Sequence, residues 1–245
     1  MLFKCELADF KIEVEHMHPR TKNKLSPYFA EFENPDMSIE IIQEDIEFER
    51  VYAENEEIRK LDKFLELNAV FRGLANQLAN FESLILHSAC FEVDGVGVAF
   101  AAHSGTGKTT HMNLWQQLLG ERMVIVNGDK PIVRFFEDEP EQPYAYGTPW
   151  NGKEHLGCNM RTPLKHICFI ERSDINYVEK IDKKDAIDRI FNQVYMPKDP
   201  IAVMNTMQLI DRLLSCCNLW VIHCNMEMQA AEIAYDAIFR TECGK

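Results

Sequence analysis

The order of apolar and polar positions divides the chain into two parts. Near the N-terminus, four segments alternate apolar and polar residues, which is the period of a strand with one buried face. These segments are Phe3–Phe10, Lys11–Glu15, Ser38–Ile42 and Ile46–Val51. The polar run 17–29 between them predicts a loop. We therefore expect residues 1–55 to form a small antiparallel β region.

A helix is predicted to follow, over residues 56–83, and to link this region to the rest of the chain. Its apolar residues recur at helical spacing, and no proline interrupts them. The residues at this spacing are Ile58, Leu61, Leu65, Ala69, Leu74 and Leu78.

Residues 84–245 combine strand and helix patterns. The segments Leu84–Val93 and Gly97–Ala101 are apolar, and Asp94-Gly95 between them favours the tight turn of a hairpin. Further strands are predicted at Met123–Val126, Ile132–Phe136, Tyr144–Tyr146, Leu164–Glu171, Tyr177–Ile181 and Leu219–His223. Helices are predicted at Thr109–Leu119, Lys184–Gln193, Ile201–Leu214 and Met228–Phe239. The fold class is therefore α/β, with some α+β character, built on a mixed sheet.

The charge of the chain bears on its partners. It has 26 Lys and Arg against 39 Asp and Glu, a net charge of −13. An acidic protein is a poor match for nucleic acid or an anionic membrane, so we expect neither as a partner. No stretch approaches the ~18 apolar residues of a membrane-spanning helix, and the start MLFKCELADF is unlike a signal peptide. We expect a cytoplasmic protein.

The eight cysteines do not follow the patterns of disulfide-rich or zinc-binding domains, because none forms a CxxC pair. The tightest group is Cys216, Cys217, His223 and Cys224, but two adjacent cysteines rarely face one metal ion. We expect reduced thiols, most of them buried, and no zinc site.

The strongest chemical signal is the segment AHSGTGKTTH, which lies between a predicted strand and a predicted helix. It matches the phosphate-binding pattern GxxxxGK[ST], known as Walker A, except that Ala102 takes the place of the first glycine. In such a P-loop, backbone amides and the start of the following helix face the phosphates of a nucleotide. The candidate nucleotide-binding residues are Ser104, Gly105, Thr106, Gly107, Lys108, Thr109 and Thr110. The alternative is a simple glycine turn followed by a solvated lysine.

Phosphoryl transfer also needs a carboxylate, which holds the metal ion or accepts the proton of the attacking hydroxyl. Asp129 follows the predicted strand Met123–Val126, whose end is expected at the same sheet edge as the loop. We expect Lys108 to reach the β- and γ-phosphates, and Thr109 and Asp129 to hold Mg²⁺. The alternative for Asp129 is an ordinary turn residue within NGDKP.

The run LHSACFEVDGVGVAFAAHSGTGKTTHMNLW resembles the catalytic domain of HPr kinase/phosphorylase, in which a histidine-bearing strand and a glycine-containing hairpin precede the phosphate loop. The core SGTGKTT is also similar to that of ATP-dependent phosphoenolpyruvate carboxykinase, and the two families share one fold. The resemblance covers residues 84–134 best. The segment Gly147–Lys153, GTPWNGK, is similar to one in the uncharacterised or peptide-modifying HPr-kinase-like proteins.

The resemblance implies roles for individual residues. His87 matches the family's catalytic histidine, which assists an aspartate. From the residues alone, without the resemblance, we expect a buried core histidine in an apolar strand. Lys108 and Thr109 match the phosphate and metal contacts. The family's Asp-Asp pair corresponds to Gly128-Asp129, so one carboxylate is missing, which weakens the implication of the reverse phosphorylase reaction. HPr itself is not implied as the acceptor, since its docking signature is not recognisable. A homo-oligomer is implied by the family's hexamers.

Residues 144–161, rich in Gly, Pro and charge, predict a loop at the same edge. Candidate contacts with the substrate or the transferring phosphoryl group are Lys130, Lys153, Glu154 and Arg161. Trp150 is a candidate for stacking on a base or a peptide, and Lys198 occupies roughly the place of a family loop that closes over the substrate. The alternatives without a function are solvated charges for Lys153 and Glu154, and a surface ion pair for Arg161. For Trp150 the alternative is a ring that only fills space in the packing.

Together these features predict a Mg²⁺-dependent kinase that uses ATP and phosphorylates a hydroxyl of a peptide, a protein serine or a small molecule. No motif separates ATP from GTP or pyrophosphate as the donor. The alternative is a nucleotide-sensing module, in which ATP binding orders the GTPW loop for a protein partner and no transfer occurs.

Overall fold

The structure is a computed structural model that describes residues 1–53 and 55–240. The N-terminal region contains a three-stranded sheet. Strands β1 (Leu2–Leu7) and β2 (Phe10–Glu15) form an antiparallel hairpin, with Ala8 and Asp9 in the left-handed conformation at its turn. Strand β3 (Met37–Glu40) pairs with β2 in parallel. Three of the four predicted strands are present, with shifted bounds. The sheet is mixed rather than purely antiparallel, because the intervening chain crosses over before β3.

The polar run 17–29, predicted as a loop, is helical: α1 spans Pro19–Leu25, and a 3₁₀ turn follows at Ser26–Tyr28. Only Thr21 and Leu25 of α1 are buried, so the helix has too narrow an apolar face to give a helical pattern.

The segment Ile46–Val51, predicted as a strand, is also helical and belongs to α2 (Gln43–Tyr52). Ile46 is its only buried residue. The helix is held by ion pairs that no periodicity reveals, since Arg72 contacts Asp45 at 2.9 Å and Glu49 at 2.7 Å.

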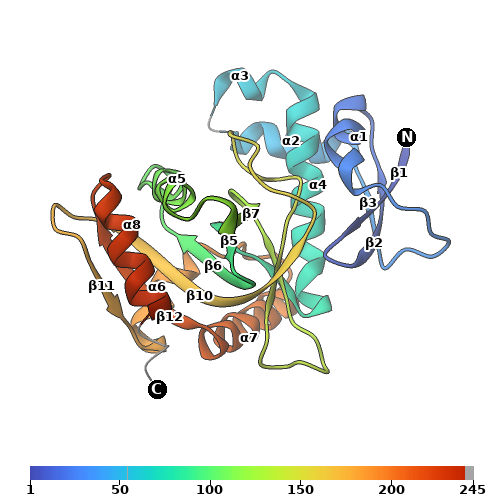
Figure 1. The fold of residues 1–245 in the computed structure, drawn as a ribbon. Helices are drawn as coiled ribbons and strands as arrows, with labels where there is room; N and C mark the ends of the chain where they lie inside the picture. The colour runs from blue at the N-terminus through green and yellow to red at the C-terminus, as the bar shows by residue number, and fades with distance from the viewer. Residues whose placement is uncertain (54, 241–245) are drawn as a thin grey trace.

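The predicted linking helix is present but interrupted. It consists of α3 (Glu56–Arg59), α4 (Asp62–Leu78) and a 3₁₀ turn at Ala79–Phe81. The buried face of α4 shares one apolar core with the N-terminal strands, and that core continues to Ile85, Ile132 and Tyr146 of the main sheet. Figure 1 shows α4 standing between the small sheet and the larger body.

The larger body is built on a nine-stranded mixed sheet. Its strands are β4 (Ser83–Ile85), β5 (Ser88–Val93), β6 (Val96–Ala101), β7 (Met123–Asn127), β8 (Ile132–Arg134), β9 (Tyr144–Tyr146), β10 (Arg161–Arg172), β11 (Tyr177–Lys180) and β12 (Asn218–Cys224). Seven of them run in the order β4-β8-β9-β10-β6-β5-β7, while β12 pairs with β10, and β11 with β12. The predicted β5–β6 hairpin is confirmed, with Asp94 and Gly95 both at positive φ.

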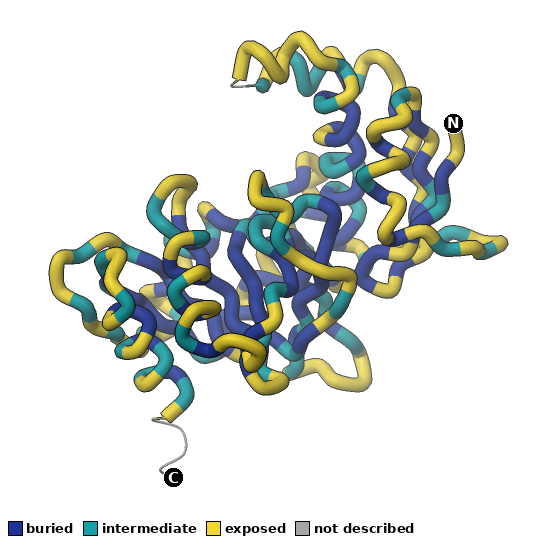
Figure 2. Tube along the Cα trace, turned by 45° about the horizontal axis from the view of Figure 1, so that its top comes forward, coloured by how far each residue is buried: buried dark blue, intermediate teal, exposed yellow. Residues whose placement is uncertain are grey.

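Helices cover both faces of this sheet. Helices α5 (Lys108–Leu119) and α8 (Met228–Tyr235), with a π-helical turn at Asp236–Arg240, share one core with it, centred on the fully buried Trp115. Helices α6 (Lys183–Phe191) and α7 (Pro200–Cys216) share a separate core with the opposite face. Figure 2 shows the buried sheet between exposed loops and helix surfaces. The expected α/β class with a mixed sheet is therefore observed.

Strand direction decides where the polar loops gather. Strands β6 and β12 both run parallel to β10. Strand β7 points the same way as β6, because both are antiparallel to β5. The chain segments that follow these four strands therefore leave the sheet at one edge, and the segment before β5 enters there, so this edge collects the chemically active residues.

The seven described cysteines are all free, and Cys243 lies outside the described residues. Among the described residues, no cluster of three or more His, Cys, Asp or Glu has the arrangement of a metal site. Within the same part of the chain, every helix is too short or too polar to cross a membrane.

Candidate functional site

The phosphate-loop segment forms the turn between β6 and α5. Gly105 and Gly107 have φ values of 78° and 124°, which side-chain-bearing residues rarely adopt, so both glycines are required by the backbone. The amide of Thr106 donates to the carbonyl of His103 at 3.2 Å. No side chain caps the start of α5, so its first amides are available to an anion.

Lys108, the first residue of α5, is turned back over this loop. Its Nζ donates to the carbonyl oxygen of Ala102 at 2.7 Å and lies 3.3 Å from Nε2 of His87. Burial lowers the pKa of Lys108, and the nearby Asp129 charge opposes this effect. The structural alternative of a solvated lysine is therefore wrong, because only 8% of the residue is exposed.

His87 and Asp129 meet beside this lysine. Nε2 of His87 lies 3.2 Å from Oδ1 of Asp129, and Nζ of Lys130 lies 3.9 Å from its Oδ2. Burial alone would raise the pKa of Asp129. The hydrogen bond from His87 and the charges of Lys130, His87 and Lys108 outweigh burial, so the pKa of Asp129 lies below its ordinary value and the group is a carboxylate at neutral pH.

Backbone pairing explains why residues distant in sequence meet here. Ser88 pairs with Ala101 across β5 and β6, which places His87 beside Ala102. The amide of Ser88 also donates to the carbonyl of Asp129 at 2.9 Å. His87 lies just before β5, outside the regular strand, and its own amide donates to the carbonyl of Gln193 at 2.6 Å.

The turn that carries Asp129 is organised by Asn127, a residue that sequence reasoning did not single out. Its fully buried side-chain oxygen accepts from the amides of Asp129 at 2.9 Å and Lys130 at 2.7 Å. Its Nδ2 donates to the carbonyl and the hydroxyl oxygen of Thr148. The NGD turn and the GTPW segment are therefore one hydrogen-bonded unit; an asparagine just before a turn aspartate was the available signal.

Gly128 occupies the position where the resembling family has a second aspartate. A Cβ atom here would lie 3.0 Å from the carbonyl oxygen of Asn151 and 3.2 Å from that of Leu156. The 151–156 segment thus packs directly on this glycine, and the amide of Gly128 donates to Leu156 at 2.9 Å. A side chain at position 128 would therefore require a small shift of the 151–156 backbone.

These residues line a cavity of about 810 Å³. Its walls hold most of the predicted site: His87, Ser104, Gly105, Gly107, Lys108, Thr109, Thr110, Gly128, Asp129, Lys130, Gly152, Lys153 and Glu154. Thr109 and Asp129, the predicted metal ligands, are both present. A hydroxyl and one or two carboxylates fit Mg²⁺, which in nucleotide sites takes its other ligands from phosphates and water.

Besides Thr106, three residues singled out from the sequence lie outside this cavity. Arg161 begins β10 and contacts Asp9 at 3.3 Å and the hydroxyl of Tyr146 at 3.1 Å, as a surface ion pair. Trp150 packs against Phe71, with ring centroids 5.2 Å apart. Nζ of Lys198 lies 3.7 Å from the centroid of the Phe48 ring. The contacts of these three residues are therefore a surface ion pair, a packed aromatic ring and a cation–ring contact. None of them lines the cavity.

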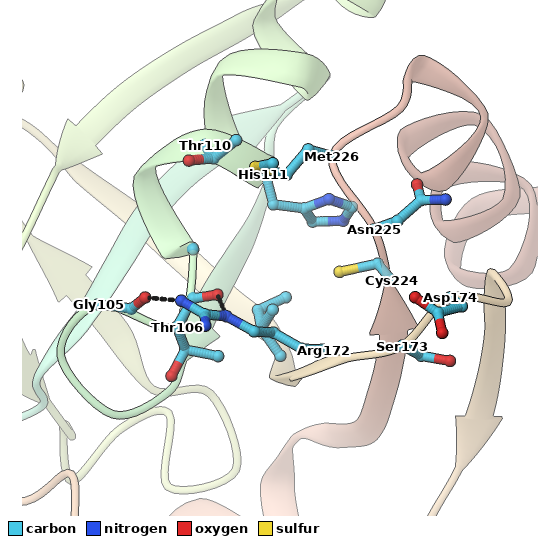
Figure 3. Close-up of a pocket in the computed structure, with 12 residues that line it drawn as sticks. Gly105, Thr106, Thr110, His111, Arg172, Ser173, Asp174, Cys224, Asn225 and Met226 are labelled. Carbon is cyan, nitrogen blue, oxygen red and sulfur yellow. Dashed lines mark hydrogen bonds between the residues drawn. The ribbon is translucent and has the colours of Figure 1, made fainter.

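A second cavity, of about 550 Å³, also borders the predicted phosphate loop (Figure 3). Gly105, Gly107 and Thr110 line both cavities. The remaining walls come from the predicted loop residue Thr106, from α5 and from the ends of β10 and β12: His111, Ile170, Arg172, Ser173, Asp174, Cys224, Asn225 and Met226. Its mixed apolar and polar lining suits the nucleoside part of a nucleotide.

Arg172 and His111 are two residues of this cavity that the sequence analysis did not assign to the site. The guanidinium of Arg172 donates to the carbonyls of Thr106, at 3.2 Å, and of Gly105, so it braces the loop. Nε2 of the buried His111 accepts from the indole of Trp115 at 3.3 Å, while its Nδ1 has no protein partner. Burial lowers the pKa of His111 to about 4, so at neutral pH the ring is neutral with its proton on Nδ1, available to an acceptor.

Comparison with known proteins adds little to this geometry. No protein-family model matches the chain, and no curated protein matches it. A solved structure, the Hpr(Ser) kinase/phosphatase from Coxiella burnetii, aligns over 65% of this chain and 93% of its own, with 10% sequence identity and a TM-score of 0.34. A likeness at that TM-score carries no argument about function.

Proposed function

We propose that this protein is a Mg²⁺-dependent kinase that transfers the γ-phosphoryl group of ATP to a hydroxyl group. The main support for this proposal is that the predicted phosphate loop, Lys108 and the His87–Asp129 pair line one cavity. Phosphoryl transfer depends mainly on positioning and on charge stabilisation, and this set supplies both.

The loop amides and Lys108 bind the β- and γ-phosphates. The ammonium group of Lys108 has three hydrogens, and its bond to Ala102 uses only one of them. Asp129 and Thr109 would hold a Mg²⁺ ion, which would neutralise phosphate charge. Lys130 and Lys153, both on the cavity wall, balance the charge on the transferring oxygens.

In the transfer step, the acceptor oxygen forms a bond to the γ-phosphorus. The bond from that phosphorus to the oxygen bridging the β-phosphate breaks, and the acceptor proton passes to the carboxylate of Asp129. His87 holds this carboxylate through its Nε2 atom and stabilises the ionised form that can take the proton.

The nucleoside of ATP occupies the second cavity, which borders the same loop. A donor without a nucleoside, such as pyrophosphate, leaves that cavity unused. The free Nδ1 hydrogen of His111 meets an acceptor atom of the base or the ribose. Calorimetric titration with ATP and with inorganic tripolyphosphate tests this part, since His111→Phe is expected to weaken only ATP binding.

The alternative function is nucleotide sensing without transfer. This alternative is favoured by the hydrogen bonds between Asn127 and Thr148, which join the Asp129 turn to the GTPW segment. A movement of the Asp129 turn on nucleotide binding would therefore also move that segment. Binding and turnover separate the two functions. In the kinase, Asp129→Asn still binds ATP and loses transfer, whereas in a sensor no acceptor is labelled by the wild-type protein.

A further inference from the structure

Basic side chains gather between the cavity and the N-terminal region, although the whole chain carries a net charge of −13. Residues 16–29 contain three basic residues and no acidic one. We define the basic track as four residues: Arg20 and Lys24 of α1, Lys63 of α4, and Lys153 of the cavity wall. Within the described chain, no salt bridge joins any of the four to a carboxylate, so their charges are open to a partner.

Helix α1 is held in place by a buried carboxylate. Glu66 of α4, which is fully buried, accepts from the amides of Met17 at 2.8 Å and His18 at 3.1 Å, and from the hydroxyl of Thr21. The acid therefore serves the start of α1 and leaves the basic residues of the helix unneutralised. Arg20 is exposed to solvent, and Lys24 is half-buried.

The end of α1 touches the segment that lines the cavity. Nζ of Lys24 donates to Oδ1 of Asn151 at 3.2 Å and lies 3.4 Å from Nδ1 of His155. Lys153, between those two residues in sequence, lines the cavity itself. The track thus begins in the cavity and reaches α1 through direct contacts.

The track continues to α4 around one aromatic ring. The guanidinium carbon of Arg20 lies 4.0 Å from the ring centroid of Phe64, and Nζ of Lys63 lies 5.7 Å from it. Arg20 also stands one helical turn from Lys24, and its charge, together with burial, lowers the pKa of Lys24. Cations this close repel one another, so an arriving carboxylate gains from all of them.

We propose that the basic track is the docking surface for the acceptor, and that the acceptor is an acidic peptide segment whose hydroxyl residue enters the cavity at Asp129. This inference rests on the proposed kinase function. An extended peptide advances ~3.3 Å per residue, so carboxylates within a few residues of the acceptor hydroxyl reach Lys153 and then Lys24. The acidic remainder of the protein repels such a peptide elsewhere, which directs it to this surface.

The test is binding of fluorescent peptides to the full chain in the presence of Mg²⁺ and a non-hydrolysable ATP analogue, measured by anisotropy at low ionic strength. Three peptides share a central serine and differ in their flanks, which are glutamate, glutamine or lysine. We expect the glutamate peptide to bind about tenfold more tightly than the glutamine peptide, with an advantage that salt removes. Arg20→Glu and Lys24→Glu are each expected to weaken it about fivefold or more.

The matched control is Lys184→Glu, which makes the same charge change at an exposed position of α6, far from the track (Figure 1). Equal binding of the glutamate and glutamine peptides would overturn the proposal, and so would an equal loss in Lys184→Glu. A single-stranded oligonucleotide that binds more tightly than the glutamate peptide and depends on Lys24 would overturn it in favour of nucleic acid.

Transfer is measured separately with the same peptides and γ-labelled ATP. Charge-selective binding without labelling refutes the kinase and keeps the docking surface. Labelling without charge preference refutes only the docking surface. Lys24→Arg is expected to keep peptide selectivity, and thermal melting confirms that each variant is folded.

Discussion

Nε2 of His87 lies 3.2 Å from Oδ1 of Asp129. The same ring nitrogen lies 3.3 Å from Nζ of Lys108, so at any moment it either donates to the carboxylate or accepts from the ammonium group. In the proposed mechanism, one histidine thus connects the residue that binds phosphate with the residue that accepts the proton. The contact joins the start of β5 to the loop that follows β7.

The first prediction concerns the pH dependence of turnover. The pKa of Asp129 is held below its ordinary value, partly by the hydrogen bond from His87, and only the ionised form accepts a proton. In His87→Ala the pKa of Asp129 rises, so the acidic limb of the kcat profile moves to higher pH. Loss of the contact that positions this carboxylate is expected to lower kcat at neutral pH by roughly 10- to 100-fold. His87→Gln, which can donate a hydrogen bond, is expected to restore part of the shift. An unchanged acidic limb in His87→Ala contradicts the assignment.

The second prediction is that Lys108 lowers the stability of the free protein while it strengthens ATP binding. The buried ammonium group is bonded to one carbonyl and to no carboxylate, so it costs stability in the free protein. Lys108→Met is expected to melt at the same temperature as the wild type or higher, and to bind ATP at least about tenfold more weakly. Calorimetry and thermal melting measure both quantities. Lys184→Met, at an exposed position, serves as the control and should change neither.

The third prediction concerns Asn127, the organiser of the Asp129 turn. Asn127→Ala removes hydrogen bonds to two backbone amides and to Thr148 in a fully buried position. We expect a loss of about 2–4 kcal/mol in the free energy of unfolding, measured in urea, together with a fall in kcat. Asn159→Ala, at an exposed position, is expected to lose less than about 0.5 kcal/mol. A similar small loss for Asn127→Ala would show that the turn does not depend on this side chain.

The elements around the site were largely predictable from the sequence because local chemistry determines them. The dipeptide Asp94-Gly95 specifies the hairpin turn, and Gly105 and Gly107 specify a loop with positive φ before a helix. Once the strands run as they do, Lys108 and Asp129 must reach one edge of the sheet. The cavity that contains both residues follows from these local signals.

The parts that the sequence did not predict depend on contacts between distant segments. Helix α1 is held to α4 by Glu66, and α2 is held to α4 by Arg72, so neither needs a broad apolar face. His111 and Arg172 become recognisable only when α5 and β10 stand on either side of one cavity. Arg161 carries charge in the right part of the sequence, but β10 directs it to Asp9 instead of the phosphate loop.

The fourth prediction concerns stability in acid. Burial lowers the pKa values of His111 and His166 to about 4, whereas in the unfolded chain a histidine titrates near 6.5. The unfolded state therefore binds more protons between these values, and stability is lost as the pH falls from about 6.5 towards 4. Each histidine accounts for up to about 3 kcal/mol of this loss. Thermal melting against pH is expected to be less steep for His166→Gln, and an unchanged slope would contradict the assignment.

The most direct test of the central claim is transfer of label from γ-labelled ATP, with Mg²⁺, into protein and metabolite fractions of a desalted lysate of the native host. Wild type and Asp129→Asn are compared at equal ATP occupancy, confirmed by calorimetry. The proposed mechanism predicts that at least one species is labelled by the wild-type protein and not by Asp129→Asn, although both bind ATP. Equal labelling by the two proteins, or ATP binding by the wild type with no labelled species, would contradict it.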